Sequence, residues 1–354
     1  MKGVLRTGIA GYGVVGKRRQ EFVNRREDMQ ITAVCDRNLD SAGEFADGTK
    51  FYDNYNRLLE EKLDALFVCI SNDMAADVTI AGLERGLHVF CEKPPGRDLD
   101  DIARVIACEK NHPELKLKYG FNHRYHLSVR DALSTLKSGE LGKVINLRGI
   151  YGKSQIVTFG KQSDWRTNRD LAGGGILLDQ GIHMVDLLRL FSGDFVEVKS
   201  FISNGFWNHN VEDNAYALLR TADGVIAMLH SSATQWRHRF SLEITLEKGT
   251  LILNGILSGS KSYGEETLTI SKNIGDDRGN PHDEVVNYEY DPSWEDEIEE
   301  FALATIGNTK IRNGSSLEAL KTMRLVYKIY CADSDWKNKW NLSRNRCWRL
   351  QKRK

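Results

Sequence analysis

Asp179 and His183 lie four residues apart, directly after the glycine run Gly173–Gly175 and at the start of a largely apolar helical pattern. Residues four apart share one face of an α-helix, so the carboxylate can orient the imidazole and stabilise its charged form. An imidazole with an unperturbed pKa of about 6.5 can take a proton from an alcohol near neutral pH. A helix-capping aspartate beside a core histidine is the alternative. The pair predicts a general base, His183, with Asp179 orienting it or binding substrate.

The segment GYGVVG has the pattern G-x-G-x-x-G and lies between an apolar strand candidate and a helix candidate. In that context Gly11 makes the tight turn, Gly13 lets the backbone approach a pyrophosphate, and Gly16 allows the helix to pack closely on the sheet. The helix N-terminus, at Val14 and Val15, faces the phosphates. A glycine-rich turn alone is common, so a second feature is needed to indicate a dinucleotide site.

That second feature is Asp36, which follows Gly16 by 20 residues at the end of the next strand candidate. This is the separation typical of the carboxylate that binds the ribose hydroxyls of NAD. The carboxylate would repel a 2′-phosphate, whereas the guanidinium of Arg37 could bind that phosphate or stack on adenine. We therefore predict NAD as the cofactor, with NADP as the alternative that Arg37 leaves open.

The segment HVFCEKP, which contains Glu92 and Lys93, places a lysine at the end of a later apolar strand. The glycine-rich motif, then E-K-P, then D-x-x-x-H resemble the Gfo/Idh/MocA family, which includes glucose–fructose oxidoreductase and inositol dehydrogenases. The resemblance extends over residues 4–335. It implies that Lys93 lies beside the nicotinamide and the substrate hydroxyl, that Glu92 belongs to the cofactor site, and that His183 is the general base. An ammonium beside an alcohol also stabilises the developing alkoxide.

A weaker match is formed by Ser71 and Asn72, which follow the apolar strand ALFVCI. The family has Thr-Pro-Asn there and a histidine three residues later. Ala75 occupies that later position in this chain. The resemblance therefore implies a cofactor contact for Ser71 and Asn72 and no further role.

Two segments are candidates for substrate binding. The segment GFNHRY resembles the family's G-F-N-x-R-F/Y junction, which implies substrate contacts for Asn122, Arg124 and Tyr125. The segment DWRTNR, just before the glycine run, contains Trp165 and Arg166. A tryptophan can cover the face of a sugar ring, and an arginine can bind a carboxylate or phosphate through two nitrogens. A solvated surface loop is the alternative for this second segment.

In the first third of the chain, short apolar runs alternate with helical patterns. The predicted strands are Val4–Ala10, Ile31–Cys35, Ala65–Ile70, His88–Cys91 and Leu115–Gly120. The predicted helices are Val14–Arg26, Leu39–Ala46, Tyr55–Glu61, Met74–Arg85 and Leu99–Asn111. Such alternation is typical of an α/β Rossmann domain, a doubly wound parallel sheet covered on both faces. We assign it to residues 1–121.

After residue 121 the pattern changes to hairpins, with glycine turns at Asp223-Gly224 and Lys248-Gly249. We predict an α+β domain for substrate binding and oligomerisation at residues 122–335, built on a large, open, mostly antiparallel sheet. An open sheet has a face that needs covering. Together with the family resemblance, this predicts a homodimer or homotetramer.

The 354 residues include 49 Lys and Arg and 49 Asp and Glu, so the formal net charge is zero. Neutrality excludes wholesale electrostatic binding of nucleic acid, and no apolar run approaches the ~18 residues of a membrane span. However, residues 336–354 contain eight basic residues, three tryptophans and no acidic residue, which leaves residues 1–335 with 41 basic residues against 49 acidic ones. This basic tail predicts contact with an anionic surface, a membrane interface or a neighbouring subunit, with a loosely ordered terminus as the alternative.

The six cysteines form no C-x-x-C pair and the nine histidines show no metal-ligand spacing. We therefore expect a cytoplasmic protein without disulfides and without a metal site. The acidic run from Glu295 to Glu300 lies at a predicted helix start, where carboxylates interact favourably with the helix dipole. It predicts a solvated helix face.

The function that these motifs favour is an NAD(P)-dependent dehydrogenase of a sugar, cyclitol or nucleotide-sugar. An alternative enzyme would hold its cofactor tightly and cycle between two substrates. A third class is a non-catalytic dinucleotide sensor, against which the joint presence of Lys93, Asp179 and His183 argues, because a sensor has no need of them.

Overall fold

The computed structural model describes residues 4–156, 165–273, 275 and 279–342. It divides into two compact units. Unit 1 comprises the residues up to Phe121, Asp170–Gly173 and Trp294–Leu320. Unit 2 comprises Asn122–Arg169, Gly174–Ser293 and the residues from Lys321 onward. One boundary between the units lies between residues 121 and 122, and unit 1 also contains two later segments, so neither unit is one contiguous range.

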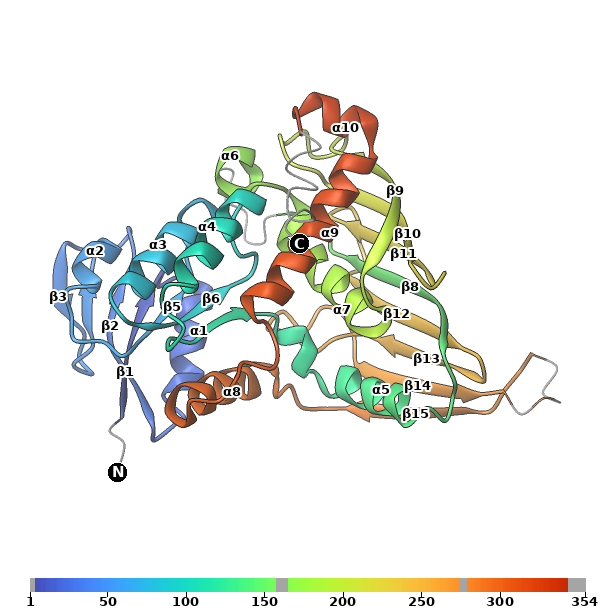
Figure 1. Ribbon diagram of the computed structural model, residues 1–354, viewed down its shortest axis with the longest axis horizontal. Coiled ribbons are helices and arrows are strands. Elements are labelled where there is room, and N and C mark those ends of the chain that lie inside the picture. The colour runs from blue at the N-terminus through green and yellow to red at the C-terminus, as the bar shows by residue number, and fades with distance from the viewer. Residues whose placement is uncertain (1–3, 157–164, 274, 276–278, 343–354) are drawn as a thin grey trace. The chain divides into compact units, whose positions relative to one another are not determined.

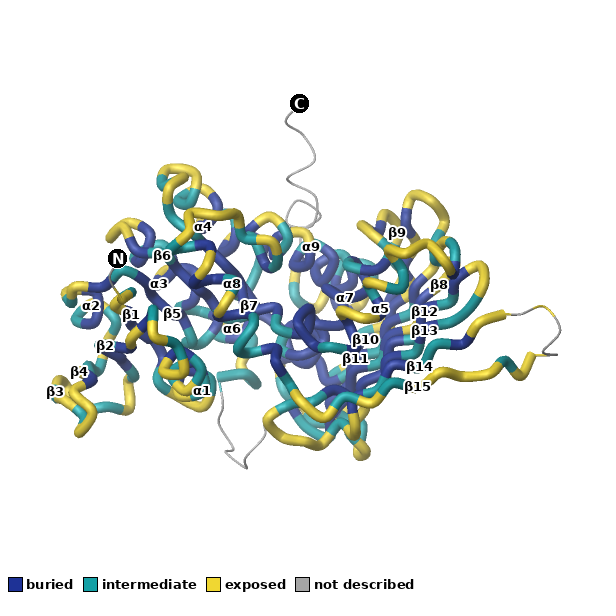
Figure 2. The backbone as a smooth tube through the Cα atoms, turned by 90° about the horizontal axis from the view of Figure 1, so that it is seen from below, coloured by how far each residue is buried: buried dark blue, intermediate teal, exposed yellow. Residues whose placement is uncertain are grey.

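Unit 1 is built on a seven-stranded sheet in the order β3-β4-β2-β1-β5-β6-β7, in which all pairs are parallel except β3–β4 (Figure 1). Strand β5 is buried along its whole length (Figure 2), as expected for a strand covered on both faces. This confirms the predicted Rossmann fold. The strands are β1 (Leu5–Ala10), β2 (Met29–Cys35), β3 (Ala42–Glu44), β4 (Lys50–Tyr52), β5 (Ala65–Val68), β6 (His88–Glu92) and β7 (Leu117–Gly120).

Helices cover both faces of this sheet. Leu66 and Phe67 are consecutive residues of β5 and therefore point to opposite faces. On one face, Phe67 meets the edge of Phe301 in the returning helix α8, with ring centroids 5.7 Å apart. On the other, a Cβ on Gly82 of α3 would come within 2.9 Å of Leu66. Helix α8 thus supplies apolar cover that the first 121 residues lack. The helices are α1 (Val14–Val23), α2 (Tyr55–Leu58), α3 (Asn72–Glu84), α4 (Leu99–Glu109), α6 (Arg169–Ala172) and α8 (Ser293–Gly307).

The predicted helix at Leu39–Ala46 is wrong, because this segment contains β3, paired antiparallel with β4. Turn chemistry determines the hairpin. Gly48 has a φ of 83°, which glycine adopts without strain. The carboxylate of Asp47 accepts a hydrogen bond from the backbone N–H of Thr49 at 2.9 Å. These two local preferences outweigh a weak helical pattern.

The acidic run at the start of α8 is also not the solvated face that we expected. Glu297 is fully buried and lies 2.7 Å from a guanidinium nitrogen of Arg19. Glu300 accepts hydrogen bonds from the backbone N–H groups of Arg312 and Asn313 at 2.8 and 2.9 Å. These carboxylates have specific partners within unit 1, and charge alone does not reveal such partners.

Unit 2 is built on an eight-stranded sheet in the order β15-β14-β13-β12-β8-β11-β10-β9. All its pairs are antiparallel except β8–β11, which is parallel. This confirms the predicted, mostly antiparallel sheet. The strands are β8 (Val144–Gly152), β9 (Phe195–Ser203), β10 (Asn214–Thr221), β11 (Ile226–Ser232), β12 (Arg239–Leu246), β13 (Gly249–Asn254), β14 (Glu266–Lys272) and β15 (Asp283–Tyr288).

Helices lie on one face of the second sheet. A Cβ on Gly149 of β8 would come within 2.7 Å of Met184 in α7, and Ser200 of β9 donates a hydrogen bond to the backbone carbonyl of Ile329 in α9. Side chains of the opposite face, such as Leu218 on β10, are exposed. The helices are α5 (Leu127–Ser138), α7 (Ile182–Ser192), α9 (Ser316–Ala332), of which the part from Lys321 belongs to unit 2, and α10 (Ser334–Lys339).

The start of the predicted basic tail is part of unit 2. Residues 334–339 form α10, and Trp336 is 4% exposed. The guanidinium of Arg169 lies over Trp340, 4.7 Å from its ring centroid. This segment is therefore packed, in place of the loosely ordered terminus that was one alternative. Trp348 and the basic residues Arg344, Arg346, Arg349, Lys352, Arg353 and Lys354 lie outside the described residues.

The cysteines correct one expectation. Cys35, Cys69, Cys91 and Cys108 are free, but Cys331 in α9 is disulfide-bonded. Burial raises the pKa values of the Cys35 and Cys91 thiols to about 12, so both are inert. Among the helices in the described part of the chain, none combines the length and apolar character needed to cross a membrane.

Candidate functional site

In unit 1, the glycine-rich turn joins β1 to α1 at the carboxyl edge of the parallel sheet. Gly11 has a φ of 93°, and a Cβ there would lie 2.3 Å from the carbonyl oxygen of Cys69, so a larger residue does not fit. By contrast, a Cβ on Gly13 would meet no atom within 4 Å. Packing within the protein therefore does not require glycine at position 13. Without a side chain there, the backbone stays accessible to a ligand. Together with the N-terminus of α1, this geometry fits a pyrophosphate.

Asp36 lies beside this turn at the end of β2. One carboxylate oxygen accepts a hydrogen bond from the backbone N–H of Tyr12 at 3.0 Å, and the other accepts two from Asn38. A carboxylate offers about four acceptor positions, so these three bonds leave one for a ribose hydroxyl on the oxygen that faces Tyr12. Arg37 is exposed at the next position. The geometry fits an adenosine ribose at Asp36.

Lys93 follows directly after β6, and the end of that strand is held by a buried ion pair. The carboxylate of Glu92 accepts a hydrogen bond from Nε of Arg19 at 2.7 Å. Arg19 is fully buried and also binds Glu297. Burial lowers the guanidinium's pKa, but the charges of Glu92 and Glu297 outweigh this and raise it. Glu92, predicted to contact the cofactor, therefore fixes the backbone that carries Lys93.

Ser71 and Asn72 lie at the start of α3. The side-chain amide of Asn72 is buried and donates a hydrogen bond to the carbonyl oxygen of Ala172 at 2.8 Å. This bond ties the segment Asp170–Gly173 to unit 1. Asn72 therefore has a structural bond, and the cofactor contacts expected of Ser71 and Asn72 stay predictions.

In unit 2, Asp179 lies just before α7 and His183 lies within it, so the two do not share one regular α-helix. Residues Leu177–Gly181 form a wider π-helical turn, and α7 begins at Ile182. The two side chains therefore do not share a face in the way that residues four apart on an ideal α-helix do. The carboxylate of Asp179 lies 3.4 Å from Nζ of Lys153 and 3.7 Å from Nε of Arg166. Asp179 thus forms part of a charged cluster with two cations.

The imidazole of His183 stacks on that of His123, with ring centroids 3.8 Å apart and an interplanar angle of 14°. One nitrogen of His123 lies 3.1 Å from the hydroxyl of Tyr151, and the other lies 3.1 Å from the side-chain oxygen of Asn122. Two imidazolium cations at this separation would repel each other. The stack therefore disfavours a state in which both imidazoles are charged, and a general base must be the uncharged one.

Several residues of this cluster were not predicted from the sequence. They are Tyr151, Lys153, Gln180, His238 and Tyr263. The hydroxyl of Tyr263 donates a hydrogen bond to the side-chain oxygen of Gln180 at 3.2 Å. Burial, with smaller effects of Tyr263 and Asp179, holds the pKa of Tyr151 well above its usual range. A lysine at the end of strand β8 was the one available signal. Tyr151 lies in β8 and Gln180 in the π-helical turn, whereas His238 and Tyr263 come from loops whose course the sequence does not reveal.

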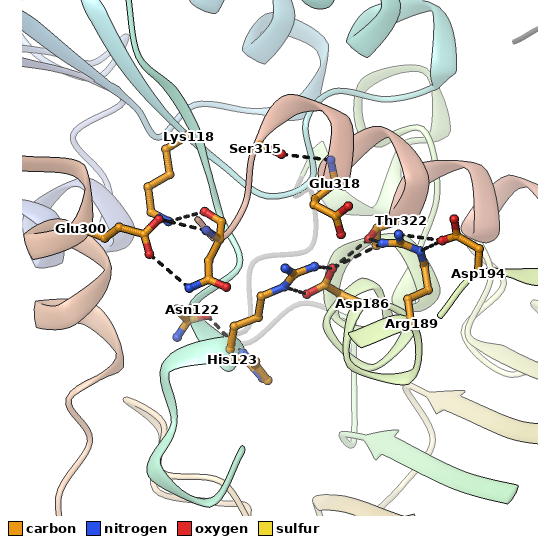
Figure 3. A network of polar contacts seen from close by, with 12 residues as sticks. Lys118, Asn122, His123, Asp186, Arg189, Asp194, Glu300, Ser315, Glu318 and Thr322 are labelled. Atoms are coloured by element: carbon orange, nitrogen blue, oxygen red, sulfur yellow. Dashed lines mark hydrogen bonds and ion pairs between the residues drawn. The ribbon is translucent and has the colours of Figure 1, made fainter. Parts of the chain in front are cut away.

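Arg124 and Tyr125, which were predicted to bind substrate, are both buried. Two guanidinium nitrogens of Arg124 bind the two carboxylate oxygens of Asp186, at 2.6 and 2.7 Å, and both residues are buried. Thr322 and Arg189 extend this network, as Figure 3 shows. Tyr125 is 3% exposed. The pairing with Asp186 gives Arg124 a structural role, and the substrate contacts expected of Arg124 and Tyr125 stay predictions.

Of the segment DWRTNR, Asp164 lies outside the described residues. Arg166 stacks on the ring of Trp165, with the guanidinium carbon 4.4 Å from the ring centroid, and reaches toward Asp179. The structure thus brings Arg166, which was predicted to bind substrate, into the same cluster as Asp179. Within the described residues, no group of three or more metal-ligating side chains comes together.

Glu212 holds the glycine run that leads into the π-helical turn. Its carboxylate is fully buried and accepts hydrogen bonds from the backbone N–H groups of Gly175 and Leu177 at 2.7 and 3.0 Å. A third bond comes from the hydroxyl of Tyr330 at 2.6 Å. Burial raises the pKa of Glu212, and these donors partly oppose the shift. Glu212 therefore positions the backbone that carries Asp179.

Family models match two consecutive segments of this chain. The family model described as "Oxidoreductase family, NAD-binding Rossmann fold" matches residues 5–121, and the GFO/IDH/MocA C-terminal domain model matches residues 129–252. D-glucoside 3-dehydrogenase of Escherichia coli (strain K12) is 30% identical over 257 residues, which cover 64% of this chain and 70% of that protein. Myo-inositol 2-dehydrogenase of Thermotoga maritima is 25% identical over 309 residues, or 84% and 87% of the two chains.

Among solved structures, levoglucosan dehydrogenase in complex with NADH has the same fold. The TM-score is 0.81 at 17% sequence identity, with 94% of this chain and 97% of that chain covered. The two family models follow each other along the chain, as the glycine-rich and catalytic motifs do. The chain belongs to the Gfo/Idh/MocA family of NAD(P)-dependent oxidoreductases.

Proposed function

We propose that this oxidoreductase transfers a hydride between a nicotinamide cofactor and the carbinol carbon of a sugar, cyclitol or nucleotide-sugar. The observation that carries the proposal is the cluster of unit 2, in which a stacked His183 lies in α7 just after the turn that presents Asp179 to Lys153. The relatives named D-glucoside 3-dehydrogenase and myo-inositol 2-dehydrogenase support a sugar or cyclitol as substrate.

The roles follow from the chemistry of each side chain. A bound nicotinamide supplies the hydride acceptor. His183 removes the hydroxyl proton, and the ammonium of Lys93 stabilises the negative charge that develops on the oxygen. Asp179 accepts a hydrogen bond from a neighbouring hydroxyl and so orients the ring. The reduction uses the same groups in reverse, with His183 donating the proton.

The direct test is a turnover screen with NAD and NADP against free sugars, cyclitols, uronic acids and nucleotide-sugars, read as formation of reduced cofactor. Lys93→Met should lower kcat by at least about 10²-fold, the effect typical of losing one group that stabilises a developing oxyanion. NADH binding, measured by fluorescence titration, should persist. Lys110→Met, at an exposed site, is the matched control. Near-full turnover by Lys93→Met would show that the role assigned to this lysine is wrong.

The preference for NAD is the part of the proposal that depends on Asp36. Asp36→Asn keeps an oxygen that can accept the Tyr12 N–H but removes the charge that repels a 2′-phosphate. A hydrogen bond to a charged group contributes about 1.5–3 kcal/mol, so KM for NAD should rise about 10- to 100-fold and KM for NADP should fall. Initial rates with both cofactors give the ratio of kcat/KM. An unchanged ratio would mean that Asp36 does not contact the ribose.

A homodimer or homotetramer is a further part of the proposal, supported by the open face of the second sheet. Phe201 is 81% exposed and Leu218 is 56% exposed on neighbouring strands, and exposed apolar patches of this kind mark interfaces. Leu218→Glu should therefore convert the oligomer to a smaller species in sedimentation velocity. Leu317→Glu, at an equally exposed leucine of α9 (61%), should leave it unchanged. The same mass for Leu218→Glu and wild type would exclude this face as the interface.

We also propose a cytoplasmic location, on the basis of the free thiols of Cys35, Cys69, Cys91 and Cys108. The disulfide at Cys331 is the observation against it.

A further inference from the structure

Three aromatic side chains, Phe206, Trp207 and Trp236, gather on two loops at one end of the second sheet. We call them the aromatic platform. Phe206 meets Trp207 and Trp236 nearly edge-on, with ring centroids 5.0 and 5.4 Å apart. Trp236 is 63% exposed and Phe206 is 58% exposed. Exposure of large aromatic rings in one place is unfavourable unless something binds them, so such a cluster marks a binding surface.

The platform is held in place by buried polar bonds. The carboxylate of Asp213, which is 1% exposed, accepts hydrogen bonds from the backbone N–H groups of Phe206 and Trp207 at 2.9 and 3.1 Å. The indole N–H of Trp207 donates to the carbonyl oxygen of Ala233 at 2.8 Å. The two loops are therefore locked to each other, and a ligand would bind without the cost of ordering them.

One end of the loop that carries Trp236 contacts the Asp179 cluster through Lys153. The backbone N–H of Gln235 donates a hydrogen bond to the carbonyl oxygen of Lys153 at 3.0 Å. The side chain of Lys153 is the one that lies 3.4 Å from the carboxylate of Asp179. Trp236 directly follows Gln235, so its Cα lies about 3.8 Å from the Cα of the residue that makes this contact.

The other end of the same loop contacts the cluster through His238. Its imidazole packs on Tyr263, with ring centroids 5.2 Å apart, and the hydroxyl of Tyr263 binds Gln180, the residue after Asp179. Both ends of the loop are thus one side chain away from the Asp179–Gln180 pair. The backbone of Trp236 therefore runs between two segments that contact this pair through Lys153 and Tyr263.

We infer that the aromatic platform binds the second ring of a glycoside, that is, the aglycone or second sugar attached to the ring that is oxidised beside Asp179. This inference rests on the proposed function and narrows the substrate class from sugars in general to glycosides. Aromatic faces pack well against the apolar C–H face of a pyranose or against an aromatic aglycone. A free cyclitol at Asp179 would leave the platform unused.

The test compares phenyl β-D-glucoside with methyl β-D-glucoside by isothermal titration of the NADH-loaded protein. Wild type should bind the phenyl glucoside about tenfold more tightly, the effect of one aromatic contact. Trp236→Ala should abolish this difference, Phe206→Ala should reduce it, and Trp236→Phe should retain most of it. Tyr290→Ala, at another exposed aromatic residue, is the control and should keep the full difference.

Three results would overturn the inference. The first is equal affinity of the wild type for the two glucosides, or no binding of either. The second is a preference for the phenyl glucoside that persists in Trp236→Ala. The third is a change of oligomeric mass in Trp236→Ala that accompanies the loss of this preference, because it would make the platform a subunit interface. The proposed function fails separately, when no sugar in the turnover screen reduces the cofactor. Titration and turnover therefore distinguish the two failures.

Discussion

Replacing His183 with alanine should lower kcat for oxidation by about 10²- to 10⁴-fold, the contribution typical of general acid–base catalysis. NADH affinity should change little, because the residues that fit the cofactor belong to unit 1. His183 is 5% exposed and stacks on His123. The variant therefore has a cavity the size of an imidazole, with the ring of His123 along one side. Added imidazole should therefore restore part of the rate. The measurement is steady-state kinetics with the best substrate of the screen, with and without imidazole.

A pH profile separates catalysis from structure in this variant. Wild-type oxidation should slow at low pH as His183 takes up a proton, and this acidic limb should disappear from kcat/KM of His183→Ala. His112→Ala removes an imidazole in unit 1 and should keep both the rate and the limb. Loss of rate in His183→Ala without imidazole rescue and with an unchanged pH profile would indicate a structural role only.

Replacing Arg19 with methionine should lower the free energy of unfolding by about 3–5 kcal/mol, the cost of breaking a buried ion pair on one side. Arg19 and Glu297 are fully buried, and Glu92 is 14% exposed. Methionine fills much of the volume but leaves two carboxylates without their cation. Urea denaturation measures the loss. Because Glu92 fixes the end of β6, the variant should also lose activity through Lys93.

The pH dependence of this loss has a definite sign. Burial raises the pKa of Glu297 from its usual 4.5 to about 7, although Arg19 opposes the shift. Between these values the native protein binds more protons than the unfolded chain, so the contribution of Glu297 to stability falls as pH rises from 4.5 to 7. Without Arg19 the native pKa rises further. Well below about pH 7, Glu297 is protonated in both native proteins, so the destabilisation caused by Arg19→Met should grow as the pH rises through and above about 7.

Two further variants test this interpretation. Arg19→Met combined with Glu297→Gln should recover part of the stability and remove most of the pH dependence. Arg25→Met breaks the exposed pair of Arg25 and Glu21, whose side chains are 47% and 59% exposed, and should cost less than about 1 kcal/mol. Equal losses for Arg19→Met and Arg25→Met would contradict the claim that burial makes the Arg19 pair costly to break.

Most of unit 1 can be predicted from the sequence because its strands carry a strong local signal. A parallel strand buried on both faces needs a short apolar run, and β5 is such a run. The nucleotide turn is equally local, because Gly11 needs a positive φ and Gly13 needs open space. Asp36 is then placed by the parallel pairing of β1 and β2.

What the sequence does not reveal depends on contacts between distant segments. Glu297 becomes buried only because α8 returns to cover unit 1, 278 positions after Arg19. Lys153 and Asp179 meet because β8 and the π-helical turn end near each other in unit 2. In the same way, Arg124 has the expected motif but pairs with Asp186, 62 residues later. Charge and motif identify such residues as important without identifying their partners.

The central claim, hydride transfer from a sugar carbon to nicotinamide, is tested most directly by isotope transfer. A substrate from the screen, labelled with deuterium at the carbinol carbon, is oxidised by the wild-type protein. The reduced cofactor is then isolated, and its mass is measured by mass spectrometry. We predict one deuterium per reduced nicotinamide, formed at least about 10²-fold more slowly with Lys93→Met or His183→Ala. Deuterium released to water, with unlabelled reduced cofactor, would contradict direct hydride transfer.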